Sequence, residues 1–570
     1  MTSNFVPRIR FVLGAVCLFA VVIAIKLFLV QIVNGNSYTE KGDKQYVKKT
    51  ESIFDRGSIF FQSKEGVKIA AATVKEGYTL AINPKILKDP EVVYETISPY
   101  VKIDKGDFLD KASKTEDPYE ELQKKIDVKT GEALASLKIP GLVVAKDSWR
   151  VYPGDSLSSQ SIGIVGFDSE NKIAGRYGLE RYYEDILSRS SQTVHTNFFA
   201  EIFSGIKENV LGKNIKSADI VATIEPGVEN FLEKTLQETE NKWNSDSIGG
   251  IIMDPNTGEI YALSSRPTFN PNNLKDIKDP KVFSNPLVED VREMGSIIKP
   301  LTIAVGLDSG AVTPNFSYND TGFMELNTKK ISNYDGRARG EHTPLQQILS
   351  QSLNIGAATV ALKVGHEEFA NYFKSFGLGE ITGIDQPNEQ KGIIKNLDSK
   401  RDIEIATASY GQGIALSPIE TVRALAILAN GGKLVIPHLV NKIEYTDGTS
   451  ENIKPETKQV ITSQTAEEVT RMLIKVVDES LKKGQVKMEH YSIAAKTGTA
   501  QIANPAAKGY YEDRYLHSFF GYFPAYNPRF IVFLYHVNPK NVEYASETLT
   551  DPFIQITKFL INYYEIPPDR

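Results

Sequence analysis

The sequence predicts an α+β protein of several domains behind a single N-terminal transmembrane helix. Three observations support this fold class. The chain has 570 residues, too many for one hydrophobic core. Residues 11–33 form one long apolar run, and beyond residue 225 strand-like runs stand at both ends of a series of helical patterns.

Composition narrows the classes of function. A hydrophobic fraction of 41% with 24% charged residues is ordinary for a globular protein. A net charge of −6 argues against a nucleic-acid partner. The chain has seven histidines and one cysteine, with no cluster at zinc-ligand spacing, so we expect no metal and no cofactor.

The apolar run at 11–33 is broken only by Lys26 and Gln31. About 20 apolar residues are enough for a helix to span a bilayer. Arg8 and Arg10 precede the run and no acidic residue occurs before Glu40, which predicts a cytoplasmic tail at 1–10. A cleaved signal peptide is the alternative, but its apolar core is usually shorter, and no small-x-small cleavage site follows. We expect an uncleaved anchor with the rest of the chain outside the cytoplasm.

Residues 34–224 mix short β-rich pieces with charged helical stretches. The pattern predicts an α+β domain for positioning or partner contact, since nothing in it looks catalytic. The expected strands lie near 59–61, 67–73, 78–82 and 142–145, and the expected helices near 119–126 and 178–187.

Residues 225–570 predict a second domain. Strand-like runs at 248–253 and 259–264 flank Asp254-Pro255-Asn256-Thr257-Gly258, a hairpin turn signal. Three more strands are expected near the end of the chain. Because helical patterns fill the interval, the first and last strands should share one sheet with a mostly helical insertion. Helices are expected at 228–243, 297–308, 344–363, 367–376, 419–430 and 464–482, and the late strands at 493–502, 517–523 and 529–536.

A serine and a lysine three residues apart open one of these helices. Ser296 and Lys299 precede Pro300, which fits only the first turn of a helix. Residues three apart share a helix face, so the Lys299 amine can lie beside the Ser296 hydroxyl. If the lysine is desolvated enough to lose its charge, the pair has the form of an activated nucleophile.

Two further motifs follow in order. Ser352-Leu353-Asn354 lies within the helical run 345–364, where a hydroxyl and an amide are costly to bury without partners. Lys496-Thr497-Gly498-Thr499 lies on an expected strand. Glycine in a strand marks a close approach of backbone or ligand, and the lysine with its flanking hydroxyls suits a carboxylate.

Each motif alone is common, but their ordered coincidence is typical of serine β-lactamases and penicillin-binding proteins. Arg56-Gly57-Ser58-Ile59, Arg150-Val151-Tyr152-Pro153 and Gly178-Leu179-Glu180 extend the likeness. The chain resembles the class B penicillin-binding proteins, the monofunctional peptidoglycan D,D-transpeptidases, over nearly its full length. The resemblance implies a pedestal or dimerisation domain at 34–224. It also implies a β-lactamase-like transpeptidase domain at 225–570, with an antiparallel sheet flanked by helices and an all-helical subdomain.

The resemblance implies a catalytic role for three residues. Ser296 would attack the carbonyl between the terminal D-alanines of a stem peptide, and an amine of a neighbouring stem would take the acyl group. Lys299 would be the base, since burial and the charge of Lys496 favour its neutral form. Ser352 would relay the proton.

It also implies the substrate contacts. Asn354 would hold the donor amide, and backbone N–H groups of Ser296 and Thr499 would stabilise the oxyanion. β-Lactams should acylate Ser296. The donor's terminal carboxylate would bind in the Lys496, Thr497, Gly498 and Thr499 motif.

Two other classes of function are compatible with the same site residues. A β-lactamase or carboxypeptidase would need a water-activating base, and no glutamate is assigned that role by sequence. A β-lactam-sensing receptor or an inactive scaffold is the other class, although none of the four residues Ser296, Lys299, Ser352 and Lys496 is lost.

Within the family, the spacing from Ser296 to Ser352 and the stretch 333–343 favour the septal over the elongation type. The expected location is the bacterial inner membrane. The expected partners are a polytopic membrane glycosyltransferase and other divisome proteins. Residues 544–553 match the small-residue pattern of the family poorly at the acceptor side of the cleft.

Overall fold

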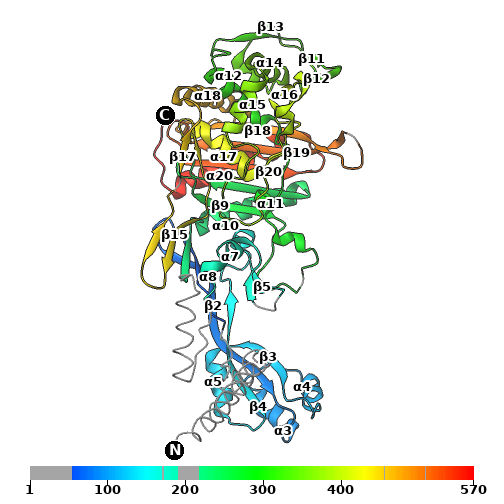
Figure 1. Ribbon diagram of the computed structural model, residues 1–570, viewed down its shortest axis with the longest axis vertical. Coiled ribbons are helices and arrows are strands. Elements are labelled where there is room, and N and C mark those ends of the chain that lie inside the picture. The colour runs from blue at the N-terminus through cyan, green and yellow to red at the C-terminus, as the bar shows by residue number, and fades with distance from the viewer. Residues whose placement is uncertain (1–53, 170–172, 190–216, 276, 455, 508) are drawn as a thin grey trace, which may run out of the picture. The chain divides into compact units, whose positions relative to one another are not determined.

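The computed structural model describes residues 54–570, apart from 170–172, 190–216, 276, 455 and 508 (Figure 1). The expected tail at 1–10 and membrane anchor at 11–33 lie outside these residues. Within the part of the chain that the structure describes, no helix combines the length and apolarity that a bilayer span needs.

The chain forms two compact units. One contains residues 76–149, and the other gathers 56–75, 150–188 and 216–570. The boundaries at 34–224 and 225–570 stay predictions, but the contacts group two N-terminal stretches with the C-terminal part of the chain.

The unit that contains 76–149 packs three helices against strands. Strand β2 (Lys68–Ile82) pairs with β3 (Glu120–Ile126) and with β4 (Leu142–Val151). Leu80, Ile97, Phe108 and Leu134 are fully buried in its core. The helices are α3 (Pro90–Ile97), α4 (Lys105–Ala112) and α5 (Val128–Ser136).

The helix expected at 119–126 is wrong, because these residues form strand β3. Its charged residues favour helix by intrinsic propensity, but cross-strand pairing with β2, such as Tyr78 opposite Ile126, decides the conformation. β3 lies at the end of its sheet, where charged side chains are tolerated and discourage edge pairing.

In the other unit, three N-terminal motifs meet in a buried ionic cluster. Glu180 accepts from Arg56 Nε at 2.6 Å and from Arg150 Nε at 2.7 Å. Arg150 also donates to the Gly57 carbonyl at 2.8 Å, and the Glu180 side chain is completely buried. Arg56 also pairs with Glu184 at 2.7 Å. The cluster therefore joins β4 and the residues just before β1 (Ile59–Gln62) to α7 (Gly178–Tyr182) and α8 (Glu184–Leu187). Strand β1 in turn runs parallel to β7 (Ala218–Ala222), with Ile59 opposite Ile220.

The central sheet of this unit is antiparallel, with strand order β18-β19-β20-β8-β9. Phe533 on β20 lies opposite Ile251 on β8, so the first and last predicted strands are adjacent, as expected. The turn predicted at 254–258 connects β8 to β9. The strands are β8 (Ser247–Met253), β9 (Ile260–Arg266), β18 (Ala494–Ala503), β19 (Tyr510–Phe523) and β20 (Phe530–Val537).

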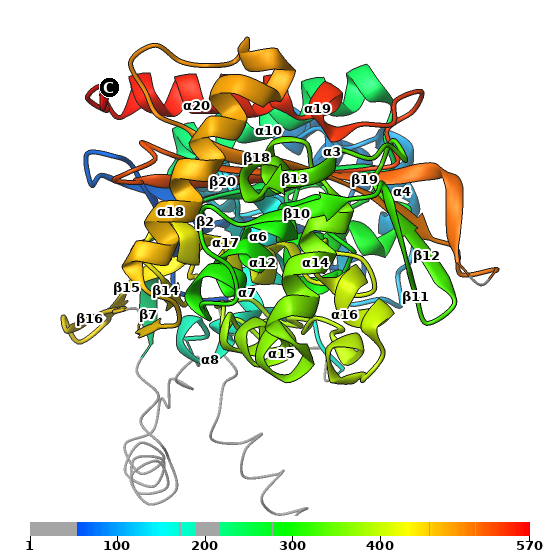
Figure 2. The ribbon, with the colours of Figure 1, turned by 90° about the horizontal axis from the view of Figure 1, so that it is seen from above.

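Helices cover both faces of this sheet. Figure 2 shows α10 (Pro226–Trp243) and α20 (Thr550–Tyr563) on one side, and α12 (Lys299–Asp308), α14 (Asn354–Val364) and α17 (Pro418–Ala429) on the other. Apolar side chains fill both interfaces. Phe519 and Phe553 pack between β19 and α20, while Phe520 and Phe533 join the core that contains α12 and α17.

The inserted subdomain is mostly helical but not all-helical. It contains two small antiparallel ribbons, β10 (Ser317–Asp320) with β13 (Gly340–Pro344), and β11 (Phe323–Leu326) with β12 (Lys329–Ser332). The other helices are α11 (Pro286–Glu289), α13 (Leu345–Ser350), α15 (His366–Ser375), α16 (Asp402–Ala408) and α18 (Ser463–Lys475). The helix expected at 464–482 continues beyond α18 as a π-helical stretch, Val476–Ser480, and ends in the kinked 3₁₀ turn Leu481–Gly484.

Candidate active site

Ser296 lies in a 3₁₀ turn, Gly295–Ile298, that leads directly into α12. Pro300 occupies the first turn of that helix, as the sequence pattern predicts. Gly295 has φ +65°, and a Cβ there would meet the Thr499 carbonyl oxygen at 2.7 Å. Only glycine allows the turn to approach strand β18 this closely.

Lys299 is completely buried and points at Ser296 and Ser352. Its Nζ lies 2.9 Å from Ser296 Oγ, 2.7 Å from the Ser352 carbonyl oxygen and 3.1 Å from Ser352 Oγ. Burial, and after it the charge of Lys496, lowers the pKa of Lys299 well below its usual value. Both causes shift Lys299 toward its neutral amine form.

Ser352 sits in a break between two helices. The sequence predicts one helix over 344–363, but α13 ends at Ser350 and α14 starts at Asn354. Ser352 has φ +55°, which non-glycine residues rarely adopt, and Leu353 is extended. The break turns both the carbonyl and the hydroxyl of Ser352 toward Lys299, which an unbroken helix would prevent.

Lys496 on β18 approaches Ser352 from the opposite side. Its Nζ lies 3.2 Å from Ser352 Oγ and 2.9 Å from the Thr497 carbonyl oxygen. Only 3% of Lys496 is exposed, and burial lowers its pKa to about 7. The Ser352 hydroxyl thus lies between two amines and can pass a proton in either direction.

Gly498 brings β18 against the Ser296 turn. A Cβ at this position would meet the Met294 carbonyl oxygen at 2.7 Å and the Ile297 nitrogen at 3.0 Å. Ser518 on the neighbouring strand donates to the same Met294 carbonyl at 2.7 Å. The close approach expected from a glycine in this strand is therefore present.

The side chains of the remaining predicted residues lie beside this cluster rather than in its hydrogen-bond network. Asn354 Nδ2 donates to the Ser332 carbonyl at 2.9 Å. Thr499 Oγ1 accepts from the Ala545 N–H at 3.1 Å. Thr497 is partly exposed next to Lys496.

Sequence reasoning missed an aromatic pair at the edge of the site. The rings of Tyr334 and Tyr544 meet edge to face, with centroids 6.1 Å apart. Tyr334 lies two residues after Ser332, and Tyr544 immediately precedes Ala545. Since both tyrosines lie in connections without periodic pattern, only the departure of residues 544–553 from the family pattern pointed to this region.

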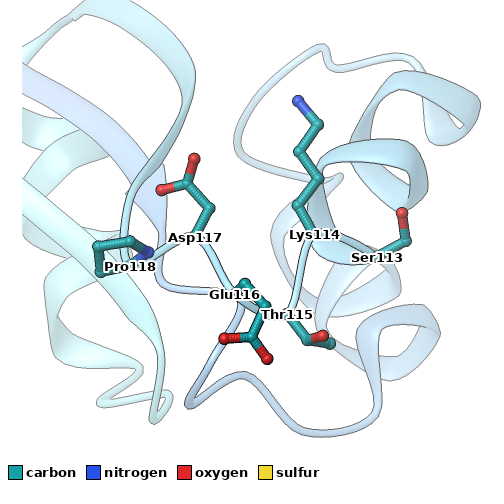
Figure 3. A pocket seen from close by; sticks show the side chains of 6 residues that line it. All are labelled: Ser113, Lys114, Thr115, Glu116, Asp117 and Pro118. Atoms are coloured by element: carbon teal, nitrogen blue, oxygen red, sulfur yellow. The ribbon is translucent and has the colours of Figure 1, made fainter.

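Among the residues that the structure describes, no group of three or more His, Cys, Asp or Glu side chains could hold a metal ion. The unit containing 76–149 has a pocket lined by the six consecutive residues 113–118 (Figure 3). Their side chains fan out in different directions and most are exposed, so this pocket offers no converging chemical groups.

Comparison with known protein families matches two regions. The penicillin binding protein transpeptidase domain matches residues 248–557, and the penicillin-binding protein dimerisation domain matches residues 55–216.

Known sequences match over most of the chain. Stage V sporulation protein D of Bacillus subtilis is 28% identical over 559 residues, covering 96% of this chain and 84% of that protein. The peptidoglycan D,D-transpeptidase FtsI of Buchnera aphidicola is 26% identical over 565 residues, covering 97% and 94%.

Solved structures share the fold. Penicillin binding protein 2X of Streptococcus thermophilus has a TM-score of 0.74 at 18% identity, covering 90% of this chain and 81% of that one. Penicillin binding protein 3 of Mycobacterium tuberculosis, complexed with aztreonam, has a TM-score of 0.68 at 21% identity, covering 91% and 98%.

Proposed function

This chain belongs to the class B penicillin-binding proteins, and on that premise we propose that it cross-links peptidoglycan stem peptides through an acyl-enzyme on Ser296. One observation carries the residue assignment. The Ser296 hydroxyl, the Ser352 hydroxyl and the amines of Lys299 and Lys496 form one connected network of hydrogen-bond distances.

The contacts of Lys299 suit a neutral amine, which has two N–H donors and one lone pair. The Ser352 carbonyl can only accept, so one N–H points to it. The second N–H points to Ser352 Oγ, and the lone pair remains for the Ser296 O–H. Lys299 is then placed to remove the Ser296 proton as the oxygen attacks the donor carbonyl.

Breakdown of the tetrahedral intermediate needs a proton on the leaving amine. Lys299, now protonated, donates to Ser352 Oγ, and Ser352 passes its own proton to the departing D-alanine nitrogen. In the second half-reaction an amine of another stem attacks the acyl-enzyme and loses a proton along the reverse path. Ser296 leaves with that proton, which restores the starting state.

The donor site would use the charge of Lys496 and the edge of the sheet. β18 ends the sheet order, so an extended peptide can pair along its outer edge. The terminal carboxylate would contact Lys496, Thr497 and Thr499, and the N–H groups of Ser296 and Thr499 would face the oxyanion. Asn354 keeps one amide N–H and its oxygen for the donor peptide, since Ser332 occupies only one N–H.

We further propose a septal role at the bacterial inner membrane, with residues 11–33 as anchor. The spacing from Ser296 to Ser352 and the stretch 333–343 support this proposal. A polytopic membrane glycosyltransferase and other divisome proteins would be its partners, and β-lactams its covalent inhibitors. An elongation role is the alternative.

Intact-mass spectrometry with a penicillin tests the nucleophile. We expect one adduct on the wild type and on Ser375→Ala, a control serine on α15, and none on Ser296→Ala. Stoichiometric labelling of Ser296→Ala, or no labelling of the wild type, would refute the assignment.

Depletion of the protein in growing cells tests the role. Filamentous cells support the septal proposal, because division then fails while elongation continues. Rounded cells would overturn it in favour of elongation.

A further inference from the structure

His517 is a buried imidazole that the proposed mechanism does not use. It lies on β19 directly opposite Thr499 on β18, and His536 on β20 lies opposite it on the other side. Directly opposed residues point to the same face of a sheet, so the three side chains form a row across it. Both histidines are fully buried.

The contacts of His517 define its tautomer. Its Nε2 lies 2.9 Å from the Glu543 carbonyl oxygen, and its Nδ1 lies 2.8 Å from Thr548 Oγ1. A carbonyl can only accept, so Nε2 carries the hydrogen. Burial lowers the pKa of His517 to about 4, so the ring is neutral and Nδ1 accepts from the Thr548 hydroxyl. One side chain therefore ties down both ends of segment 543–548.

Segment 543–548 borders the proposed donor site. The Ala545 N–H donates to Thr499 Oγ1, which leaves the hydroxyl hydrogen of Thr499 free to donate to a ligand. Tyr544, one residue earlier, holds the ring that meets Tyr334. If the segment shifts, the direction of the Thr499 hydroxyl and the position of the Tyr544 ring change together.

We propose that His517 is a positioning residue for the acyl donor: by fixing segment 543–548 it aims the Thr499 hydroxyl at the donor carboxylate. This inference rests on the proposed function of the Ser296 site. It assigns a role in substrate binding to a residue that never touches the substrate.

His536 is a matched control on the next strand. It is the same residue type, fully buried, with its side chain on the same face. Neither of its ring nitrogens has a hydrogen-bond partner among the described residues. Replacing it perturbs the same sheet without releasing segment 543–548.

The experiment measures penicillin acylation by stopped-flow kinetics, separating the initial dissociation constant from the acylation step. We expect His517→Leu to lower acylation efficiency by about tenfold to hundredfold, because a misplaced contact group weakens binding of the ligand. The loss should appear mainly as a larger initial dissociation constant. His517→Gln should recover part of the loss, since its amide N–H can reach the Glu543 carbonyl. His536→Leu should match the wild type.

A double variant separates positioning from general damage. If His517 acts through Thr499, then His517→Leu combined with Thr499→Val should be no worse than Thr499→Val alone. Should His517→Leu fail to fold, Thr548→Val removes the Nδ1 contact without a volume change and should lose about threefold or more in affinity.

Equal acylation by His517→Leu and the wild type, or an equal loss in His536→Leu, overturns the inference. Fully additive losses of acylation efficiency in the double variant of His517 and Thr499 also overturn the inference. Failure of the proposed function looks different, because the wild type would then not be labelled or Ser296→Ala would be.

Discussion

The burial of Lys299 supports the proposed chemistry but lowers the free energy of unfolding. In the unfolded chain a lysine has a pKa of about 10.4, so it binds a proton at neutral pH. Burial, and after it the charge of Lys496, lowers the pKa of the native lysine well below this value. Below about pH 10 the unfolded state then binds more protons, and the stability contributed at this site falls as the pH falls.

We predict that Lys299→Met abolishes acylation and raises the midpoint of thermal unfolding at pH 7. Methionine fills a similar volume with no charge to desolvate. Lys234→Met, at an exposed position on α10, should change neither acylation nor the midpoint. A lower midpoint for Lys299→Met would show that its three polar contacts outweigh the desolvation.

Lys496 should make ligand binding depend on pH. Its pKa of about 7 means that the charge is present below neutrality and is lost above it. We predict that the dissociation constant of a penicillin, measured from pH 6 to 9, rises by up to about tenfold per pH unit above the pKa. Lys496→Arg, charged throughout this range, should bind more weakly but with a flat profile; a flat wild-type profile would contradict the assignment.

For single residues, the sequence predicts the chemical role of a side chain better than the backbone conformation that places it. The Ser296 and Lys299 pair follows from helical spacing and Pro300, both of which are local. The left-handed conformation of Ser352 does not follow from local signals, because the pattern from Leu345 to Val364 predicts one apolar helix. Tertiary contacts with Lys299 and Lys496 impose that break, and no local signal records them.

Among the elements, β18 and the Ser296 turn depend on the absence of a side chain at residue 498. We predict that Gly498→Ala lowers acylation about a hundredfold, because a Cβ would push backbone atoms apart by several tenths of an ångström or more. Gly106→Ala, in the exposed first turn of α4, is the control and should acylate normally. Normal acylation of Gly498→Ala would show that the turn can shift without loss.

The tyrosine pair connects two elements across the site, the β12–β13 connection and segment 543–548. Tyr334 is 57% exposed and Tyr544 38%, so the contact is weak, about 0.5–1.5 kcal/mol, and can open. We predict that Tyr334→Ala and Tyr544→Ala each raise acylation by a bulky β-lactam relative to a compact one, with non-additive effects. Tyr526→Ala, exposed on the β19–β20 turn, should leave this ratio unchanged, and an unchanged ratio in all three variants would exclude the role.

Element types were predictable where a pattern was long and buried. The strand pairs around 254–258 and 524–528 follow from turn signals between apolar runs, and α10 from Pro226 and helical spacing. β3 was not predictable, because its charged sequence has a helical propensity and only its partner β2 makes it a strand.

For the whole molecule, the Arg56, Arg150 and Glu180 cluster is the expected weak point. Removing one member of a buried ion cluster leaves uncompensated charge and costs about 3–5 kcal/mol. We predict that Glu180→Ala strongly lowers the midpoint of thermal unfolding. A triple variant with Arg56→Met, Arg150→Met and Glu180→Leu should recover much of the lost midpoint. Glu121→Ala removes an exposed ion pair with Lys124 and should change little; a similar shift in both single variants would contradict this reading.

The sequence could not predict which parts of the chain belong together. The expected helix and strands that begin just after residue 225 suggest one boundary, whereas residues 56–75 and 150–188 pack with 216–570. Pairings such as Ile59 with Ile220 join positions far apart in the chain, and single-sequence patterns record only near neighbours.

The order β19-β20-β8 places strand β20 between two strands that precede it in the sequence. As a nascent polypeptide leaves the ribosome, Ser296 emerges well before Phe530–Val537 can insert beside β8. Strand β18 therefore lacks its supporting neighbours until residues 510–537 have been synthesised. Translation products truncated before residue 530 should be inert toward penicillins, so reactivity would itself report that β20 had been made.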